Sequence, residues 1–328
     1  MAFCVRRFLG IALTITPMRL INLLGVYVGY AVSGVIRRPI VLSTPSFITI
    51  EPVCGCNLAC PECPVGTGEL WRQRGRMKAE MLKSILKSIA KRAIWANLYF
   101  QGEPLLNSNL PELVQILSAR RVFTSMSTNG LLLTEELANN LMNSGLKEII
   151  FSIDGSTEKE YLTYRRGGSI EGAWSAVATM VAVRKSKRAM FPRIVVQCLV
   201  TSANENGLVI VRQRALSMGA DVVEFKTLHL HHGVDSLHLL PTIQQYSRYA
   251  EKRRKPCFNF PCFRLWSTAV LSWNGELALC CMDKEVEVLN TQLGSNLNVE
   301  WTADGFQLLR RDSINDRYGL PLCKSCDL

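Results

Sequence analysis

The stretch Cys56-Asn57-Leu58-Ala59-Cys60-Pro61-Glu62-Cys63 carries three thiols at the spacing C-x3-C-x2-C. It follows an apolar run, Phe47 to Val53, that predicts a strand. Three closely spaced thiolates can hold three irons of a four-iron cluster, and the fourth iron is then open to a small molecule. The stretch therefore favours an enzyme with Cys56, Cys60 and Cys63 as its catalytic metal ligands.

Two closed sites are alternatives to this interpretation. A zinc site uses four nitrogen or sulfur ligands, and an electron-carrying ferredoxin has its fourth cysteine nearby, followed by proline. Cys54 lies two residues before Cys56. If Cys54 were a fourth ligand, the site would be structural or would only transfer electrons, and the sequence alone leaves its role open.

The composition indicates an intracellular globular protein. Its 328 residues are 48% hydrophobic, enough for one large domain and a smaller one. Clustered thiols, here and at Cys323-x2-Cys326, need a reducing compartment, so we expect a cytoplasmic protein. The net charge is +11, but the basic patches at 72–78, 184–188 and 252–255 lack interleaved aromatic residues. They are interpreted as solvated surface, with no specific nucleic acid as partner.

Residues 1–46 form a segment of different character. Five arginines and no acidic residue precede Glu51, and the apolar stretch Phe8 to Ile36 is interrupted by Pro17, Arg19 and Asn22. A membrane span needs about 20 apolar residues. Three interpretations stay open: an interfacial helix on an anionic membrane surface, a helix packed on the following domain, and an export signal or true span. The first would place the protein peripherally at the inner face of the membrane.

Strand-like and helix-like segments alternate from residue 47 to residue 228. This pattern predicts an α/β fold with a parallel sheet, namely a partial (β/α)6 barrel of the TIM type rather than a closed eight-fold one. A linker, 229–256, and a small C-terminal domain, 257–328, complete the expected organisation. The predicted strands are Phe47 to Val53, Trp95 to Gln101, Val122 to Thr128, Glu148 to Asp154, Arg193 to Thr201 and Asp221 to Thr227.

Polar or glycine-bearing motifs occur at the ends of these strands. In parallel sheets the carboxyl ends of the strands meet at one rim, where ligands bind. The motifs are Cys54 to Cys63, Gln101-Gly102-Glu103-Pro104, Ser127-Thr128-Asn129-Gly130 and Ser152-Ile153-Asp154-Gly155, with Gln197 inside the fifth strand. Their joint placement predicts a single ligand site at that rim.

With these motifs the chain resembles the radical S-adenosylmethionine (radical SAM) superfamily from Phe47 onward. The resemblance implies that Cys56, Cys60 and Cys63 bind a [4Fe-4S] cluster whose open iron is chelated by S-adenosylmethionine. One electron, from a reductant such as flavodoxin or ferredoxin, would cleave the cofactor to a 5'-deoxyadenosyl radical. That radical would abstract a hydrogen atom from a substrate.

The resemblance also implies contacts to the adenosyl cofactor. The family's motif for the methionine ammonium is matched by Gln101-Gly102-Glu103-Pro104, with Gln101 in place of a glycine. Arg165 is a candidate partner for a carboxylate. The position before the third cysteine is commonly aromatic in the family but is Glu62 here. Further candidate contacts are Ser127, Thr128, Asn129, Ser152, Asp154 and Gln197.

The C-terminal cysteines resemble a shortened auxiliary-cluster domain of the kind called SPASM or twitch. The resemblance implies a second [4Fe-4S] cluster bound by Cys262, Cys280, Cys323 and Cys326. A β-hairpin turning at Asn274-Gly275 and a helix are expected here. If the second hairpin strand is regular, Cys280 and Cys281 point to opposite faces, and Cys280 is the expected ligand. A zinc ribbon built from the same thiols is the alternative.

The substrate stays open between a peptide and a small or lipid-linked molecule. A non-catalytic iron–sulfur carrier or scaffold at the membrane is the alternative from another class. Four histidines between the barrel and the C-terminal domain could bind a metal, contact substrate or belong to a linker: His229, His231, His232 and His238. Cys257 and Cys281 have no assigned role.

Overall fold

The computed structural model describes residues 2–231, 233–249, 261–289, 297–324 and 326. Cys257, His232 and the expected boundary at 256/257 lie outside these residues. The strands are β1 (Phe47–Ile50), β2 (Val53–Cys54), β3 (Gly75–Arg76), β4 (Trp95–Asn97), β5 (Phe123–Thr128), β6 (Glu148–Ser152), β7 (Arg193–Val200), β8 (Val222–Thr227), β9 (Thr268–Leu271) and β10 (Leu277–Ala278). The helices are α1 (Ala2–Ala12), α2 (Pro17–Ile36), α3 (Pro64–Thr67), α4 (Ala79–Ile89), α5 (Leu110–Ser118), α6 (Glu135–Asn143), α7 (Glu158–Tyr164), α8 (Ile170–Ser186), α9 (Leu208–Met218), α10 (Arg264–Ser267), α11 (Leu297–Thr302) and α12 (Asp304–Asp316).

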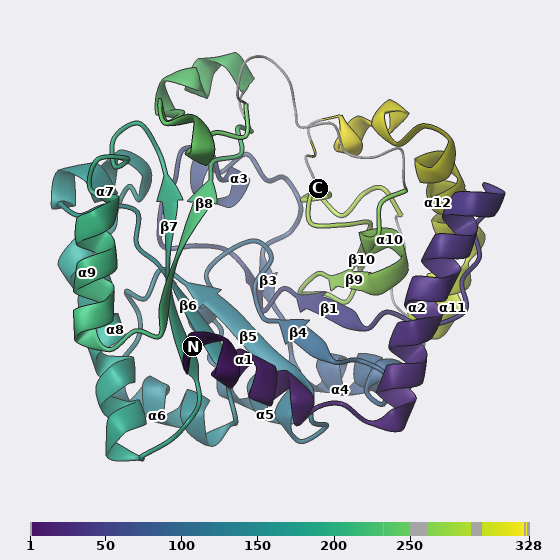
Figure 1. Ribbon diagram of the computed structural model, residues 1–328, viewed down its shortest axis with the longest axis horizontal. Coiled ribbons are helices and arrows are strands. Elements are labelled where there is room, and N and C mark those ends of the chain that lie inside the picture. The colour runs from purple at the N-terminus through teal and green to yellow at the C-terminus, as the bar shows by residue number, and fades with distance from the viewer. Residues whose placement is uncertain (1, 232, 250–260, 290–296, 325, 327–328) are drawn as a thin grey trace.

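The main sheet has the strand order β10-β9-β1-β4-β5-β6-β7-β8. Its six strands β1, β4, β5, β6, β7 and β8 pair in parallel. Each lies within one of the six strands that the sequence predicts, although β1 and β4 end earlier than predicted. The helices α4, α5, α6, α8 and α9 cover the outside of the curved sheet (Figure 1). The partial barrel is therefore confirmed.

Alternation along the strands divides the sheet into two faces. Ile48, Ile149 and Val196 are buried and join the core beneath the outer helices. Thr49, Asn97 and Glu148 belong to the opposite register and line a cavity inside the barrel. Because successive side chains of a strand point to opposite faces, the same six strands build both a hydrophobic core and a polar lumen.

The C-terminal segment extends the barrel sheet. The predicted hairpin forms, with Gly275 at a φ of 87° in its turn, and β10 pairs antiparallel with β9. Beyond this expectation, β9 pairs in parallel with β1, from Phe47 opposite Thr268 to Ile50 opposite Leu271. The cysteines after β10 are thus fixed directly to the strand that precedes the first cysteine loop.

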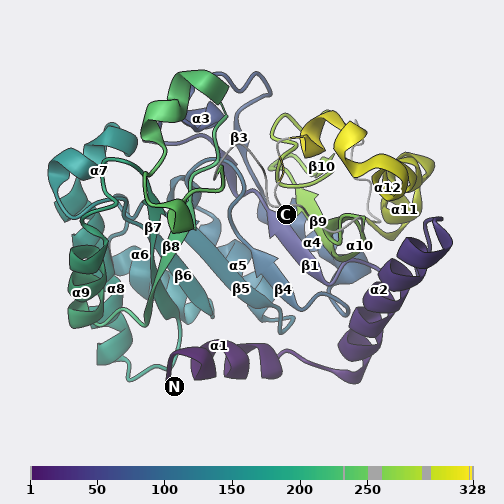
Figure 2. The ribbon, with the colours of Figure 1, turned by 45° about the horizontal axis from the view of Figure 1, so that its top comes forward.

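The two N-terminal helices pack on the barrel. In Figure 2, α1 crosses the end of the barrel where the strands begin, and α2 rises beside α10, α11 and α12. Trp266 donates its indole N–H to the Ile40 carbonyl at 3.0 Å, and Trp301 donates to Ser43 at 3.1 Å. Tyr30 packs edge-to-face on Phe263. The packing interpretation of this segment is therefore correct for one face of α2.

Arg19 anchors α2 to the ends of two barrel helices. Its guanidinium, 3% exposed, donates to the carbonyls of Thr14, Ala90, Arg120 and Arg121 at 2.5–3.0 Å. The last carbonyls of a helix have no partner within the helix, so they require donors from outside. One arginine supplies such donors after both α4 and α5.

Replacing Arg19 by alanine should destabilise the whole chain. The variant leaves these carbonyls without their donor, at an expected cost of about 3 kcal/mol in the free energy of unfolding. Urea unfolding followed by circular dichroism measures this cost. Arg38→Ala, at an exposed position after the same helix, should change it by less than about 0.5 kcal/mol. Equal effects of the two variants would contradict the anchoring role.

Candidate functional site

The three cysteines of the first motif lie in a loop between β2 and α3. Cys60 is buried, Cys56 and Cys63 are half-buried, and the Cys56 sulfur accepts the backbone N–H of Leu58 at 3.4 Å. All three sulfurs adjoin one apolar cluster that includes Leu58, Tyr164, Leu228, Leu230 and Leu239. The loop therefore presents three thiols in a largely water-excluded setting, which fits the donor set of an iron–sulfur cluster.

Arg165 supplies positive charge beside these thiols. It is ion-paired with Asp154, and its Nη1 lies 4.0 Å from the Cys60 sulfur. Burial raises the pKa of the Cys60 thiol to about 11, and Arg165 opposes that rise. Metal binding displaces such thiol protons. Since Asp154 also accepts the Leu199 N–H at 2.6 Å, Arg165 is held in place from β7.

Gly102 holds the second rim motif against the cysteine loop. Its φ of +79° favours glycine, and a Cβ there would lie 2.5 Å from the carbonyl oxygens of Val53 and Gly55. The next residue, Glu103, donates its N–H to Gly55 at 2.8 Å. The close approach of these two backbones is possible only without a side chain at 102.

Glu103 ties three rim segments together. Its carboxylate accepts hydrogen bonds from the Thr128 hydroxyl at 2.6 Å, the Asn129 N–H at 2.8 Å and the Leu105 N–H at 3.0 Å. Burial raises the pKa of Glu103, and these donors oppose that rise. Both of its oxygens are engaged, so Glu103 organises the rim, and Pro104 opens the short turn that follows it.

The third and fourth rim motifs lie beside this network. The Asn129 amide donates to the Asn57 side chain at 2.8 Å, which links β5 to the cysteine loop. The hydroxyls of Ser127 and Ser152 are 3.5 Å apart. Gln197 stands opposite Ser152 in the sheet register and lines the lumen. Gln101, directly before Gly102, is buried. The structure therefore brings the candidate contacts to one end of the barrel.

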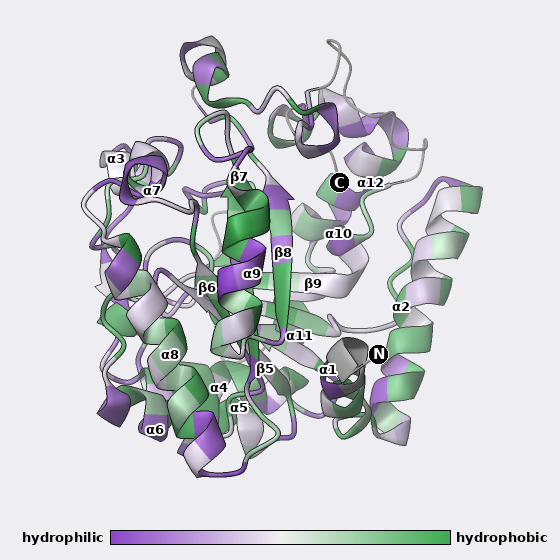
Figure 3. Cartoon of the chain, turned by 60° about the vertical axis from the view of Figure 1, so that its left-hand side comes forward, coloured by the Kyte–Doolittle hydropathy of each residue, from purple (hydrophilic) through white to green (hydrophobic). Residues whose placement is uncertain are grey.

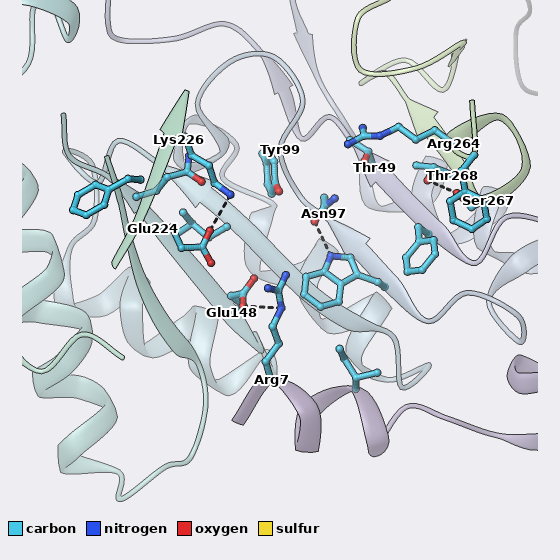
Figure 4. Close-up of a pocket in the computed structure, with 17 residues that line it drawn as sticks. Arg7, Thr49, Asn97, Tyr99, Glu148, Glu224, Lys226, Arg264, Ser267 and Thr268 are labelled. Carbon is cyan, nitrogen blue, oxygen red and sulfur yellow. Dashed lines mark hydrogen bonds and ion pairs between the residues drawn. The ribbon is translucent and has the colours of Figure 1, made fainter. Parts of the chain in front are cut away.

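The barrel lumen is a cavity of about 910 Å³ with charged walls. In Figure 4, Arg7 reaches up from α1 toward Glu148, while Lys226 pairs with Glu224 at 3.1 Å. The distance between Arg7 and Glu148 is 3.7 Å. Burial, with the Glu148 charge as a further cause, raises the pKa of Tyr99 to about 12. The lumen offers a polar chamber whose side walls are β8 and α10.

Cys54 belongs to a different apolar cluster, against which Cys56 and Cys63 also pack. It is in β2, buried with Val65 and Leu70, and burial raises its pKa to about 11, with the charge of Glu51 adding to the rise. Cys54 is thus placed as a small apolar core residue.

The contacts of several other residues around the cysteine loop are not predictable from the sequence. Glu62 is buried and accepts the backbone N–H of His231. Burial lowers the pKa of Lys284, and the charges of Cys63, Glu62 and Cys281 oppose that fall. Asn57 was within the quoted motif, but no spacing rule marked it. These contacts join distant segments and leave no local pattern.

The C-terminal cysteines surround a second, apolar hollow. Leu265, Leu279, Leu320 and Leu322 line it with Cys262, Cys280, Cys281, Cys323 and Cys326. Cys280 and Cys281 follow β10 in a bend and turn, so the expectation that a regular strand separates them is wrong. Both reach the hollow, and Arg264 donates to the Cys281 sulfur at 3.0 Å.

The histidines form no metal site in the described part of the chain. Among those residues, no three His, Cys, Asp or Glu side chains form a group that could hold a single metal ion. His238 is exposed and contacts the Asp235 carbonyl at 3.1 Å.

Two family models match the chain. The radical SAM superfamily model matches residues 50–197, which contain the cysteine loop and most of the barrel. A model of an iron–sulfur cluster-binding domain, SPASM, matches residues 262–327. The first implies a [4Fe-4S] cluster with S-adenosylmethionine, and the second implies an auxiliary cluster.

Curated relatives match part or most of the chain. A mycofactocin maturase of Mycobacterium tuberculosis is 29% identical over 141 residues, 43% of this chain and 36% of the relative. The chain therefore spans about a third of the length of that relative. A tungsten-containing aldehyde ferredoxin oxidoreductase cofactor-modifying protein of Pyrococcus furiosus is 24% identical over 319 residues, 86% of this chain and 87% of the relative.

Solved structures share the fold. The crystal structure of SuiB from Streptococcus suis superposes with a TM-score of 0.64 at 14% sequence identity. The match covers 83% of this chain and 69% of SuiB. It supports the partial barrel with its C-terminal extension.

Gly102→Ala should detach the cysteine loop from the rim. The added Cβ clashes with two backbone oxygens of that loop, so the purified variant should lose about four of about eight irons per chain. Colorimetric iron and sulfide analysis measures this loss.

Gly68→Ala is the matched control. Gly68 has the same φ of +79° but no atom within 4 Å of a Cβ, so its substitution costs about 1–2 kcal/mol of backbone strain and retains the iron. If both variants kept full iron content, the close approach at Gly102 would not matter for the loop.

Proposed function

Because the chain belongs to the radical SAM superfamily and carries an auxiliary iron–sulfur cluster-binding domain, we propose that it cleaves S-adenosylmethionine reductively and abstracts hydrogen from a substrate in the lumen. A [4Fe-4S] cluster held by Cys56, Cys60 and Cys63 would pass one electron from an external reductant to the carbon–sulfur bond of the cofactor, which would yield methionine and a 5'-deoxyadenosyl radical. The observation that carries the proposal is the junction of the Cys56–Cys63 loop with the rim at Gly102 and Glu103.

The residues of the rim have separate roles in this proposal. Cys56, Cys60 and Cys63 bind iron and leave one iron for the cofactor. The backbone beside Gly102 receives the methionine ammonium, since the Glu103 carboxylate is occupied by its three donors. Arg165 offers its remaining donors to a carboxylate, and Asp154 positions it. The remaining contacts to the cofactor are assigned to Gln101, Pro104, Ser127, Thr128, Asn129, Ser152 and Gln197.

A peptide substrate is supported by relatives whose names describe peptide chemistry. A PqqA peptide cyclase of Granulibacter bethesdensis is one such relative, 28% identical over 191 residues, 56% of this chain and 49% of the relative. In the lumen, Arg7 and Lys226 face Glu148 and Glu224, so both charge signs are available to a polar substrate. A small or lipid-linked substrate is the second candidate, favoured by the apolar exposed residues of the N-terminal helices.

The auxiliary cluster is assigned to Cys262, Cys280, Cys323 and Cys326. We keep Cys280 as the fourth ligand, because its sulfur accepts the backbone N–H of Met282 at 3.4 Å, as the Cys56 sulfur accepts that of Leu58. Arg264 donates to the Cys281 sulfur. Arg317 lies 3.8 Å from the Cys326 sulfur, so two arginines flank this hollow and would offset the negative charge of a thiolate-bound cluster.

The setting of the enzyme is part of the proposal. Reduced thiols favour the cytoplasm, where flavodoxin or ferredoxin can act as reductant, and we place the enzyme peripherally at the inner face of the membrane. The proposed units are the N-terminal segment 1–46, the barrel 47–228, a linker 229–256 and the auxiliary domain 257–328.

Alanine at Cys56, Cys60 or Cys63 should abolish cofactor cleavage, because each variant removes an iron ligand. Chromatography of 5'-deoxyadenosine after reduction with dithionite in the presence of S-adenosylmethionine measures it. Cys54→Ala should retain cleavage, since Cys54 packs with Val65 and Leu70. Absence of 5'-deoxyadenosine from the unaltered protein would favour the non-catalytic carrier or scaffold. Loss of cleavage in the Cys54→Ala variant would indicate that Cys54 is the fourth ligand of a closed site.

Metal analysis should find about eight irons and no zinc per chain. Cys262→Ala, Cys323→Ala and Cys280→Ala should each lower the iron content by up to about four, while Cys281→Ala should not. Four irons with one zinc would refute the auxiliary cluster in favour of the zinc ribbon. If Cys281→Ala lowered the iron content and Cys280→Ala did not, Cys281 would be the fourth ligand instead of Cys280.

A further inference from the structure

Helix α2 turns its polar side chains toward the protein and its apolar side chains outward. Arg19, Asn22 and Ser33 are buried. The whole helix is described, and its exposed residues are all apolar or aromatic; the large ones are Met18, Leu20, Ile21, Leu24, Tyr27, Val28, Val32, Val35 and Ile36. A surface helix of a water-facing domain has the opposite polarity. The outward face of α2 is therefore suited to an apolar medium.

The apolar surface continues onto α1 and the turn after it. Phe8 is 72% exposed and Leu13 66% exposed, and Ile15 follows them. We call these three residues and the large exposed residues of α2 the apolar edge. Figure 2 shows α1 and α2 as the outermost elements of their side of the molecule, and Figure 3 shows the hydrophobic colouring of α2 at its margin.

Basic residues stand at both ends of the apolar edge. Lys91, Arg92 and Arg121 are exposed beside the start of α2, where they line two surface hollows together with Thr16 and Met18. Arg37 and Arg38 are exposed at the far end. No acidic residue lines either hollow. An apolar strip between cationic groups complements a bilayer whose headgroups are anionic.

The contacts of α2 distinguish lying on a bilayer from crossing it. By length and composition α2 could span a membrane, a test that a buried core helix or a signal sequence also passes. However, Arg19 binds carbonyls of the barrel, Asn22 binds Thr44 and Ser46 at 2.9–3.0 Å, and Ser33 binds the Ile40 segment. Spanning would break these contacts along most of the helix, whereas lying flat keeps them.

A second copy of the chain fits the apolar edge less well. A two-fold axis would set two α2 helices either antiparallel or parallel. Both arrangements bring cationic ends together, Arg37 and Arg38 against Lys91 and Arg92 in the first, and like ends in the second. Like charges across an interface oppose association.

We propose that the apolar edge seats the protein on the surface of a bilayer containing anionic lipid, with the lumen wall at Phe263 next to the membrane. Tyr27 in the edge stacks on Phe263, with ring centroids 5.1 Å apart, and Phe263 lines the lumen together with Ile11 of α1. If the proposed function holds, a substrate with a lipid anchor reaches the lumen without leaving the membrane.

Vesicle flotation tests this seat. The full-length protein should float with vesicles of phosphatidylcholine mixed with phosphatidylglycerol, and at least about tenfold less of it with phosphatidylcholine alone. The triple variant Ile21→Gln, Leu24→Gln, Val28→Gln should reduce flotation at least about tenfold. The matched control is Val209→Gln with Ile210→Gln on α9, also exposed by 65% and 56%, and it should float like the unaltered protein. Lys91→Gln with Arg92→Gln and Arg121→Gln should lose only the preference for phosphatidylglycerol.

Three outcomes would contradict binding of the apolar edge to the membrane surface. They are equal flotation of the triple variant and the control, a lipid-free dimer in sedimentation that the triple variant abolishes, and resistance of bound protein to carbonate extraction, which marks a span. Cleavage of S-adenosylmethionine is measured in every variant and should be unchanged, because the substituted residues belong to neither the cysteine loop nor the rim. Loss of cleavage in unaltered, vesicle-bound protein would contradict the proposed function and leave the seat intact.

Discussion

The buried carboxylate of Glu103 is the interaction on which the arrangement of the rim depends. It accepts three hydrogen bonds from segments after β4 and β5, and its own N–H donates to Gly55 in the cysteine loop. A buried carboxylate without such donors would be strongly disfavoured, so the rim segments and the carboxylate stabilise one another. The three thiols are thereby fixed at one end of a lumen whose charged residues come from β6, β8, α1 and α10.

The second dependence is the pairing of β9 with β1. It sets the apolar hollow of Cys262, Cys280, Cys323 and Cys326 on the strand that leads into the Cys56 loop. Cys63 of the first group and Cys281 of the second both oppose the lowering of the Lys284 pKa by burial. The barrel and the C-terminal segment therefore share one sheet, and the two groups of cysteines are held in a fixed relation.

The sequence predicted the parts that rest on local pattern. Six strands follow from alternation, and the rim follows because parallel strands end on the same side. The pairing of β9 with β1 joins residues too far apart for any periodic signal. The bend that directs both Cys280 and Cys281 into the hollow likewise has no sequence pattern that would predict it. In the sequence, Arg19 and Asn22 only interrupt an apolar run. In the structure, both are buried and bind α2 to the rest of the protein. The prediction of solvated basic patches is wrong for Arg72 and Arg184, which pair with Glu51 and Asp221.

The central claim is that the Cys56–Cys63 loop holds a cluster with one iron open to S-adenosylmethionine. Electron paramagnetic resonance of the reduced protein tests it most directly, in a Cys262→Ala, Cys323→Ala background that removes the auxiliary signal. The account predicts that adding S-adenosylmethionine changes the g-values of the remaining cluster signal. An unchanged signal, at a concentration that saturates binding by equilibrium dialysis, would contradict it.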